Sequence, residues 1–145
     1  MFSIRFSRIP NRPAYREFLP GRIVAGRLNE GFRSAMGYWN ADDYRRQWAE
    51  AIDLIIAGGE KAALITSIEY PGESGALDCW PLFREGQRIF LRYQLLIFAQ
   101  LGQTFDASKI GELVGTRKEF SEDGPRISEW SFNLADLVRF RKTVP

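Results

Sequence analysis

The chain has 145 residues, of which 45% are hydrophobic and 14% aromatic, and its formal net charge at pH 7 is +2. That length suits one domain, and that apolar content can fill a core, so the composition excludes a globally disordered chain. A net charge this small does not by itself indicate a nucleic-acid or anionic-membrane partner. We therefore expect a single domain over residues 1–145.

The first strands and the helix that follows them are predicted from periodicity. Phe2, Ile4 and Phe6 alternate with polar residues and predict a half-buried strand. A second strand is expected over residues 23–28, a tight turn at 29–31, and a returning strand over 32–39. A helix is expected to begin after Asn40, whose side chain can cap it, and to end at Gly58.

Five apolar residues of this helix fall on one stripe, which we expect to pack on the sheet. They are Tyr44, Trp48, Ala51, Ile52 and Ile55.

The second half of the chain predicts further strands and two short helices. Residues 62–68 are almost all apolar or small and indicate a strand buried on both faces. Residues 76–84 form another strand, in which Pro81 indicates a bulge or an edge. Residues 89–97 alternate as one long strand, and short helices are expected over 107–114 and from residue 134. The order predicts an α+β domain: a curved, mostly antiparallel sheet packed on one central helix, with a short C-terminal helix.

Several kinds of chemistry are absent from the sequence. The chain has no histidine, which removes the Ser-His-Asp and Cys-His nucleophile pairs and the usual zinc ligand sets. Glycine-rich phosphate loops are also missing. Cys79 is the single cysteine, so no internal disulfide can form, and we expect a buried structural thiol. These observations favour a protein that is not an enzyme and has no metal or cofactor.

The N-terminal residues also bear on location. Arg5 and Arg8 interrupt the apolar run that a secretory signal needs. No stretch approaches the roughly 18 apolar residues of a membrane span. We expect a soluble, cytoplasmic protein without a membrane partner.

Charge is distributed unevenly along the chain. Residues 1–33 hold seven arginines against Glu17 and Glu30, a net charge of +5, whereas the rest holds 13 basic and 16 acidic residues, a net charge of −3. The arginines either form a solvated face or bind phosphates or acidic groups. The second interpretation gives the alternative function, a small nucleic-acid-binding or regulatory module that uses the arginine-rich N-terminal third.

Two groups of acidic residues are candidate binding sites. The first group is Glu119, Glu122, Asp123 and Glu129, and the second is Glu69, Glu73 and Asp78. For the first group we weigh a solvated turn, a contact surface for a basic partner, and a metal or catalytic site. The four tryptophans are expected in the core.

One ordered set of residues resembles a known family. The set is Tyr38-Trp39, Asp43-Tyr44, Gln47-Trp48-Ala49-Glu50-Ala51, Gly59, Lys61 to Ser67, Leu82-Phe83-Arg84-Glu85-Gly86, Ser121-Glu122-Asp123-Gly124 and Ile127-Ser128-Glu129-Trp130. In this order and spacing, roughly residues 36–138 resemble immunity proteins of bacterial contact-dependent growth inhibition systems.

The resemblance implies a cytoplasmic binding protein. Its partner would be the cognate C-terminal toxin domain of a delivered surface protein, whose active site it blocks. Such toxins are often nucleases, and direct nucleic-acid binding by the immunity protein itself is not expected. The oligomeric state stays open.

A nuclease surface shaped for phosphates is basic, so acidic groups would complement it. We therefore hypothesise that one of the two acidic groups contacts the toxin, with the group at 119–129 favoured.

Overall fold

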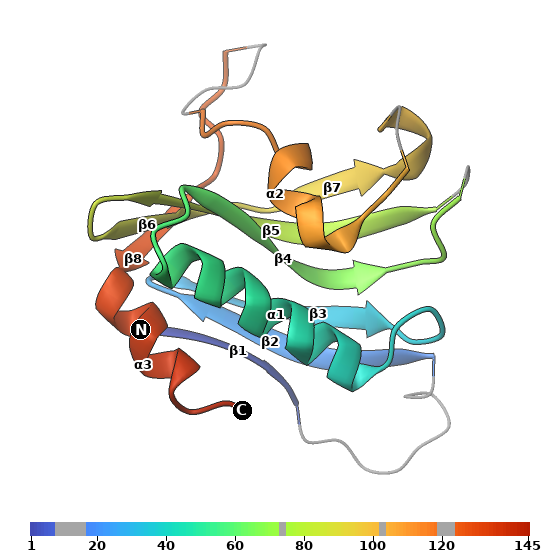
Figure 1. Ribbon diagram of the computed structural model, residues 1–145, viewed down its shortest axis with the longest axis horizontal. Coiled ribbons are helices and arrows are strands. Elements are labelled where there is room, and N and C mark those ends of the chain that lie inside the picture. Colours follow the sequence, from blue (N-terminus) through green and yellow to red (C-terminus); the bar gives the residue numbers. More distant parts are fainter. Residues whose placement is uncertain (8–16, 73–74, 102–103, 119–123) are drawn as a thin grey trace.

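The computed structural model describes residues 1–7, 17–72, 75–101, 104–118 and 124–145. Figure 1 shows a long helix lying across one side of two groups of strands. The elements in order are β1 (Phe2–Phe6), β2 (Phe18–Ala25), β3 (Leu28–Ala35), α1 (Ala41–Ile56), β4 (Lys61–Ile68), β5 (Ala76–Glu85), β6 (Arg88–Leu91), β7 (Gln94–Ile97), η2 (Phe98–Gln100), η3 (Ala107–Lys109), α2 (Ile110–Leu113), β8 (Trp130–Asn133) and α3 (Leu134–Arg141).

The expected α+β fold is confirmed. Every strand pairing in the described part of the chain is antiparallel, α1 is the central helix, and α3 is the short C-terminal helix. The strands form two sheets, of three and five strands, where the sequence suggested one. None of the helices formed by these residues is long and apolar enough to cross a membrane.

The three-stranded sheet has the order β1-β2-β3, and its second hairpin turns at Gly26 and Arg27. Ala25 pairs with Leu28, and Gly26 has a φ of 60°. A two-residue turn with positive φ at its first position suits glycine, which has no Cβ to clash. The turn expected at residues 29–31 is therefore wrong, and Glu30 belongs to β3.

The five-stranded sheet has the order β4-β5-β6-β8, and β7 also pairs with β5. β6 lies along residues 82–85 and β7 along residues 76–79 of the same strand. Pro81 falls between them, where its carbonyl oxygen accepts a hydrogen bond of 3.2 Å from the Arg92 backbone. Pro81 has no N–H to donate to a neighbouring strand, and it lies where the pairing partner of β5 changes from β7 to β6. The single strand expected over 89–97 is instead two strands, interrupted at Arg92 and Tyr93.

Helix α1 begins at a reciprocal cap. The Asn40 side chain accepts a hydrogen bond of 2.9 Å from the Asp43 backbone, and the Asp43 carboxylate accepts one of 2.9 Å from the Asn40 backbone. This capping box satisfies donors that the first turn leaves free. The helix is followed by Gly58, whose φ of 108° suits glycine. All five residues of the predicted stripe are buried.

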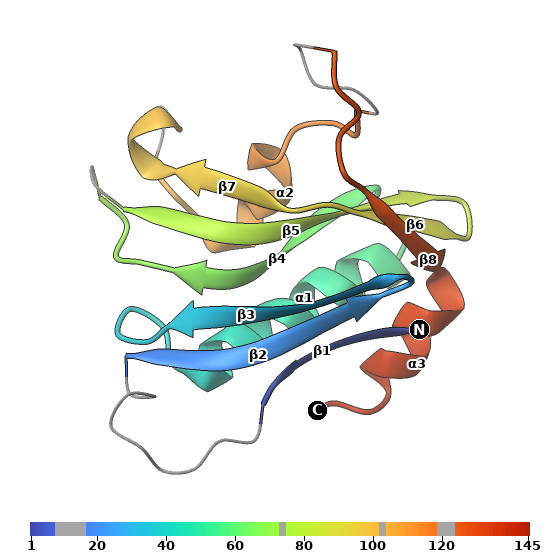
Figure 2. The ribbon, with the colours of Figure 1, turned by 180° about the vertical axis from the view of Figure 1, so that it is seen from behind.

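β3 and β4 lie side by side without belonging to one sheet (Figure 2). Side chains bridge the seam between them. The Ala35 N–H donates to Ser67 Oγ at 3.1 Å, and Ser34 Oγ donates to the carbonyl oxygen of Thr66.

Helix α1 supplies further partners for the β4 edge. The Gln47 amide donates to the Ala63 carbonyl at 2.7 Å and accepts from the Ile65 N–H at 2.8 Å. The Tyr44 hydroxyl accepts from the Ile68 N–H at 3.0 Å. Buried backbone groups that the sheets leave unpaired are thus satisfied by side chains.

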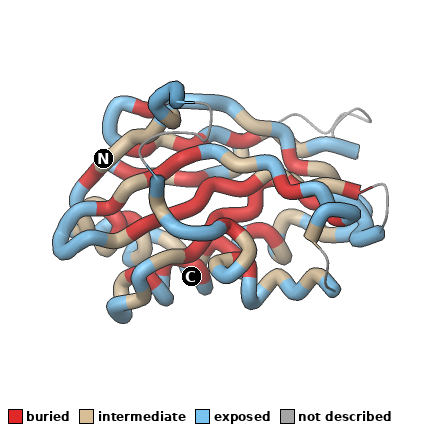
Figure 3. The backbone as a smooth tube through the Cα atoms, turned by 90° about the horizontal axis from the view of Figure 1, so that it is seen from above, coloured by how far each residue is buried: buried red, intermediate tan, exposed pale blue. Residues whose placement is uncertain are grey.

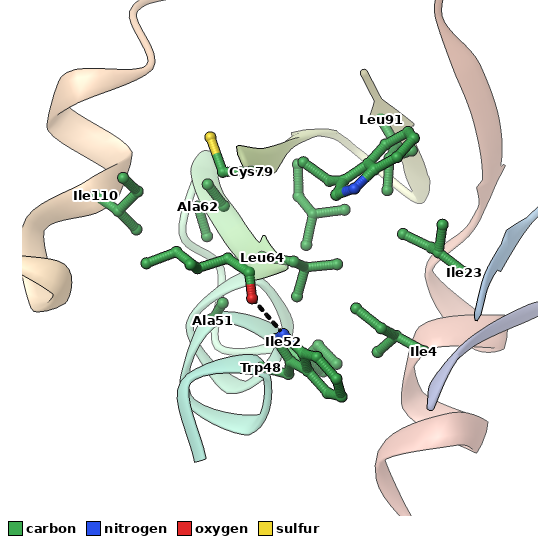
Figure 4. Packing of buried hydrophobic residues seen from close by; sticks show 14 of the residues in the cluster. Ile4, Ile23, Trp48, Ala51, Ile52, Ala62, Leu64, Cys79, Leu91 and Ile110 are labelled. Atoms are coloured by element: carbon green, nitrogen blue, oxygen red, sulfur yellow. Dashed lines mark hydrogen bonds between the residues drawn. The ribbon is translucent and has the colours of Figure 1, made fainter. Parts of the chain in front are cut away.

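The core lies between the sheets and α1. Figure 3 shows that the buried positions concentrate on the middle of the strands. Figure 4 shows Trp48, Leu64 and Ile23, from α1, β4 and β2, facing a common interior. Cys79 is fully buried in this cluster, and burial raises the pKa of its thiol to about 12. The expected structural thiol is therefore placed in the core, where it stays protonated at neutral pH.

Candidate functional site

Three of the seven acidic candidates, Glu69, Asp78 and Glu129, lie among the described residues. Glu73, Glu119, Glu122 and Asp123 lie outside the described residues. Glu69 is exposed after β4, Asp78 is half-buried on β5, and Glu129 is half-buried just before β8.

Glu129 is held in an ion pair. Two nitrogens of Arg117 donate to its carboxylate at 2.9 and 2.6 Å, and a third donates to Glu85 at 2.9 Å. The same guanidinium lies over the Phe90 ring, 3.7 Å from its centre. A two-point ion pair stacked on an aromatic ring is geometrically demanding. Through Arg117, Glu129 therefore links the segment before β8 to the β5–β6 hairpin.

Asp78 has different surroundings. Its carboxylate accepts a hydrogen bond from the Tyr93 hydroxyl. The register places Asp78 opposite Leu95, so both side chains lie on the same face of the five-stranded sheet. Of the described acidic candidates, Asp78 is the one that lies within an apolar surface.

That surface continues a stripe that begins in the core. Ile89 and Leu91 are fully buried, whereas Tyr93, Leu95 and Ile97 are 46%, 51% and 37% exposed. Alternate residues of β6, and the register of β7 with β5, put the stripe on one face. The stripe is buried along β6, the strand that pairs with β8, and open along β7. Figure 2 shows β7 on the side of the molecule away from α1.

A groove of about 430 Å³ lies beside the open part of the stripe. Glu30 and Arg33 of β3 line one side, and Asp78 and Trp80 of β5 line the other; Tyr93 and Trp130 complete it. The Trp80 ring lies 5.4 Å from the ring of Tyr93 and 6.2 Å from that of Trp130, between ring centres. With Phe32, which also lines it, the groove thus combines four aromatic residues with two carboxylates and one arginine.

The electrostatic environment of the groove is acidic. Partial burial raises the pKa of Tyr93, the hydrogen bond to Asp78 raises it further, and the negative charges of Asp78 and Glu30 add to the shift. Tyr93 therefore remains a neutral donor at physiological pH.

Two other grooves have mixed charge. One of about 410 Å³ lies between α1 and the α2 region, and is lined by Glu50, Glu112, Arg46 and Lys61 among others. One of about 650 Å³ lies among β1, α1 and the C-terminal segment. No group of three metal-ligating side chains occurs among residues with described positions.

Three of the described arginines of the N-terminal third, Arg5, Arg22 and Arg33, share one face of the three-stranded sheet, because Arg5 pairs with Arg22 and Arg22 pairs with Gly31. Arg5 faces the C-terminal segment, with its guanidinium 5.4 Å from the centre of the Phe140 ring. Arg22 donates to Asn29 at 2.8 Å, and Arg33 lies over the Phe18 ring at 5.0 Å. Arg8, Arg12 and Arg16 lie outside the described residues.

Sequence reasoning found Asp78 but missed its neighbours in the groove. The turn composition of residues 29–31 predicts a turn at Glu30, and the alternation of residues 89–97 predicts one long strand through Tyr93. Of the four tryptophans expected in the core, Trp48 and Trp80 are buried, whereas Trp39 and Trp130 are half-buried.

The geometry fits a small α+β binding protein with one open, aromatic-lined sheet face. Residues 34–140 match the family model described as the CdiI N-terminal domain. The chain belongs to this family.

Two relatives extend the comparison. The chain is 24% identical over 121 residues to the immunity protein CdiI of Enterobacter cloacae subsp. cloacae, covering 83% of each sequence. Its fold is similar to that of a chain in the CdiA-CT/CdiI toxin and immunity complex from Enterobacter cloacae, with a TM-score of 0.87 and 22% identity. That match covers 99% of this chain and 97% of the other.

Proposed function

We propose that this chain is an immunity protein that binds and neutralises the CdiA C-terminal toxin domain encoded beside it. The observation that carries the proposal is membership of the CdiI family over residues 34–140. The fold match over nearly the whole chain supports it, because that relative is a chain from a toxin and immunity complex. The protein would act inside the cell that makes it.

Neutralisation would be non-catalytic. The chain would cover the active site of the toxin and exclude its substrate, with the affinity supplied by the interface. A nuclease toxin fits the acidic, aromatic groove, because a phosphate-binding surface is basic and complements carboxylates.

Co-expression tests the proposal. The toxin domain is induced in a sensitive bacterial strain, with or without this chain. We expect growth arrest with the toxin alone and growth close to that of the uninduced strain when the chain is present. A toxin domain from an unrelated locus is the control and should still arrest growth.

Continued arrest by the cognate toxin, despite soluble and folded chain in the cells, would contradict the proposal. Binding of the purified pair is measured in parallel by calorimetry, where we expect one toxin domain per chain.

The exposed arginines of β2 and β3 keep a second candidate function open. A nucleic-acid-binding module would bind a short single-stranded oligonucleotide through Arg22 and Arg33, with Phe18 beside Arg33. Its affinity would fall steeply between about 50 and 200 mM salt. For an immunity protein we expect no measurable binding to this probe at the higher salt concentration.

A further inference from the structure

We propose that the groove between β3 and β5 receives a cationic side chain, arginine or lysine, from the toxin domain, while Tyr93, Leu95 and Ile97 form the apolar contact area beside it. The inference rests on the proposed function and deepens it by naming the surface and the chemistry of the group it accepts.

The carboxylates of the groove have oxygen atoms that are free to accept further hydrogen bonds. Tyr93 donates to one oxygen of Asp78. Within the described part of the chain, neither the other oxygen of Asp78 nor the carboxylate of Glu30 accepts a hydrogen bond or forms an ion pair. Two carboxylates that line one groove and form no ion pair with Arg33, which also lines it, favour a positively charged guest.

The arginine at the rim does not neutralise them. Arg33 also lines the groove, but its guanidinium lies over the ring of Phe18 on the neighbouring strand β2. The two carboxylates of the groove are therefore available to a cationic side chain of a bound protein.

The aromatic rings suit the same guest. Guanidinium and ammonium groups bind over the faces of tryptophan and tyrosine, with most gain where water is excluded. Trp80 contacts both Tyr93 and Trp130 but is itself buried, so the rings open to the guest are those of Tyr93 and the half-buried Trp130. Arginine, tryptophan and tyrosine also carry a large share of the binding energy in protein interfaces.

The open stripe identifies the guest as part of a protein. Tyr93, Leu95 and Ile97 project from one face at alternate positions and form a continuous apolar strip. Isolated exposed apolar residues are ordinary, but a contiguous strip beside a charged groove is typical of a protein contact. A nucleic acid would be repelled by the carboxylates.

Matched charge neutralisation tests the groove. Asp78→Asn with Glu30→Gln removes two charges and preserves shape, and Glu50→Gln with Glu112→Gln removes two exposed charges beside the α1–α2 groove. Binding to the cognate toxin domain is measured by surface plasmon resonance at low salt. We expect at least about a tenfold weaker affinity for the first pair, mainly through faster dissociation, and less than a twofold change for the second.

Two substitutions of opposite charge at one exposed position test whether the guest side chain is positively charged. Leu95→Glu and Leu95→Lys remove the same apolar side chain, and the fold should tolerate both because Leu95 is 51% exposed. A cationic guest predicts at least about fivefold weaker binding for Leu95→Lys than for Leu95→Glu. Thermal unfolding of each variant, with a midpoint close to that of the unmodified chain, verifies the fold.

The outcomes separate the two levels of the proposal. The groove is excluded as the binding site if the Asp78 and Glu30 substitutions leave tight toxin binding unchanged. It is also excluded if the two Leu95 variants bind the toxin with equal affinity. Neither result contradicts the proposed immunity function. No binding by the unmodified chain overturns both. A dimer of the free chain that Leu95→Lys dissociates, seen by light scattering, assigns the strip to self-association and also overturns the inference.

Discussion

The indole nitrogen of Trp48 donates a hydrogen bond of 2.7 Å to the carbonyl oxygen of Ile65. This bond joins α1 to the edge of β4 that has no backbone partner in β3, and Figure 4 shows the tryptophan inside the packed core. The ring also contacts Phe6 and Phe32, with centres 5.0 and 5.9 Å away. The Trp48 side chain therefore packs in the core and also donates a hydrogen bond to a carbonyl oxygen at the seam between the sheets. Together these contacts fix how α1 lies on the sheets.

Replacement of Trp48 should separate these two contributions. Trp48→Ala is expected to lower the free energy of unfolding by about 3–5 kcal/mol, the range for truncating a core aromatic residue. Trp48→Phe keeps an aromatic ring but leaves the Ile65 carbonyl without its donor, and should cost about 1–3 kcal/mol. Both are measured by urea unfolding, with the exposed Glu50→Ala as a control within about 0.5 kcal/mol. An unchanged midpoint for Trp48→Ala would show that the residue does not support the core.

The Cys79 thiol should be inert in the folded protein. It is fully buried, and burial raises its pKa to about 12, so the reactive thiolate is scarce at pH 8. We expect labelling by a maleimide or a disulfide reagent to be at least about a hundredfold slower in buffer than in denaturant. Lys142→Cys, at an exposed position, is the control and should label at once. Equal rates for Cys79 in the two conditions would contradict its burial.

Stability should fall at alkaline pH. Burial raises the pKa of Cys79 from 9.0 and that of Tyr44 from 10.0, each to about 12. Because the unfolded chain loses these protons first, their contribution is complete below pH 9 and is lost as the pH rises to about 12. We expect a nearly constant urea midpoint from pH 7 to 8.5 and a decline above pH 9.

The onset of that decline identifies the group. In Cys79→Ala the decline should begin near pH 10, whatever the absolute stability of the variant. A decline that begins at pH 9 in both proteins would exclude the thiol as its source.

Glu129 should matter more for stability than for association. Its side chain is 17% exposed, and that of Arg117 is 22% exposed. Glu129→Gln removes the carboxylate charge to which Arg117 donates two hydrogen bonds, and should lower the free energy of unfolding by about 1.5–3 kcal/mol. The exposed pair of Arg46 with Asp43 gives the control, where Arg46→Ala should cost less than about 1 kcal/mol. Equal effects would mean that the Arg117 pair behaves as an ordinary surface ion pair.

The sequence predicts best the features that depend on local chemistry. Asn40, Asp43 and Gly58 define the ends of α1 through capping rules, and the 3.6-residue period places Trp48 in the core. The ordered family residues predict the fold and the class of protein. The capping and periodic signals lie within a few residues of one another, whereas the family residues form an ordered set along residues 36–138.

The features that were missed depend on pairing between distant segments. The composition of Asn29-Glu30-Gly31 predicts a turn at Glu30, whereas the register of β2 with β3 puts the turn at Gly26. Gln47 was not on the apolar stripe, yet it is buried because β4 needs partners. The stripe opens at Tyr93, where the pairing partner of β5 changes from β6 to β7, and that change depends on pairing between distant segments.

The last prediction concerns the favoured acidic loop. Glu122 and Asp123 lie outside the described residues, and their contact with the toxin stays a prediction. Rim charges change association more than dissociation, because they steer the encounter while remaining hydrated. Glu122→Lys with Asp123→Lys should therefore slow association several-fold at low salt, weaken its salt dependence, and leave dissociation and the unfolding midpoint nearly unchanged.

Glu50→Lys with Glu112→Lys carries the same reversal beside the α1–α2 groove and tests whether net charge alone explains the effect. Steering by net charge predicts equal slowing for both pairs, whereas a local contact predicts slowing by the loop pair only. Reversal of Glu69 and Glu73 examines the second acidic group in the same way. If neither acidic group alters toxin affinity or association at low salt, the acidic-loop hypothesis is wrong, and the arginine-bearing strands β2 and β3 become the next surface to test.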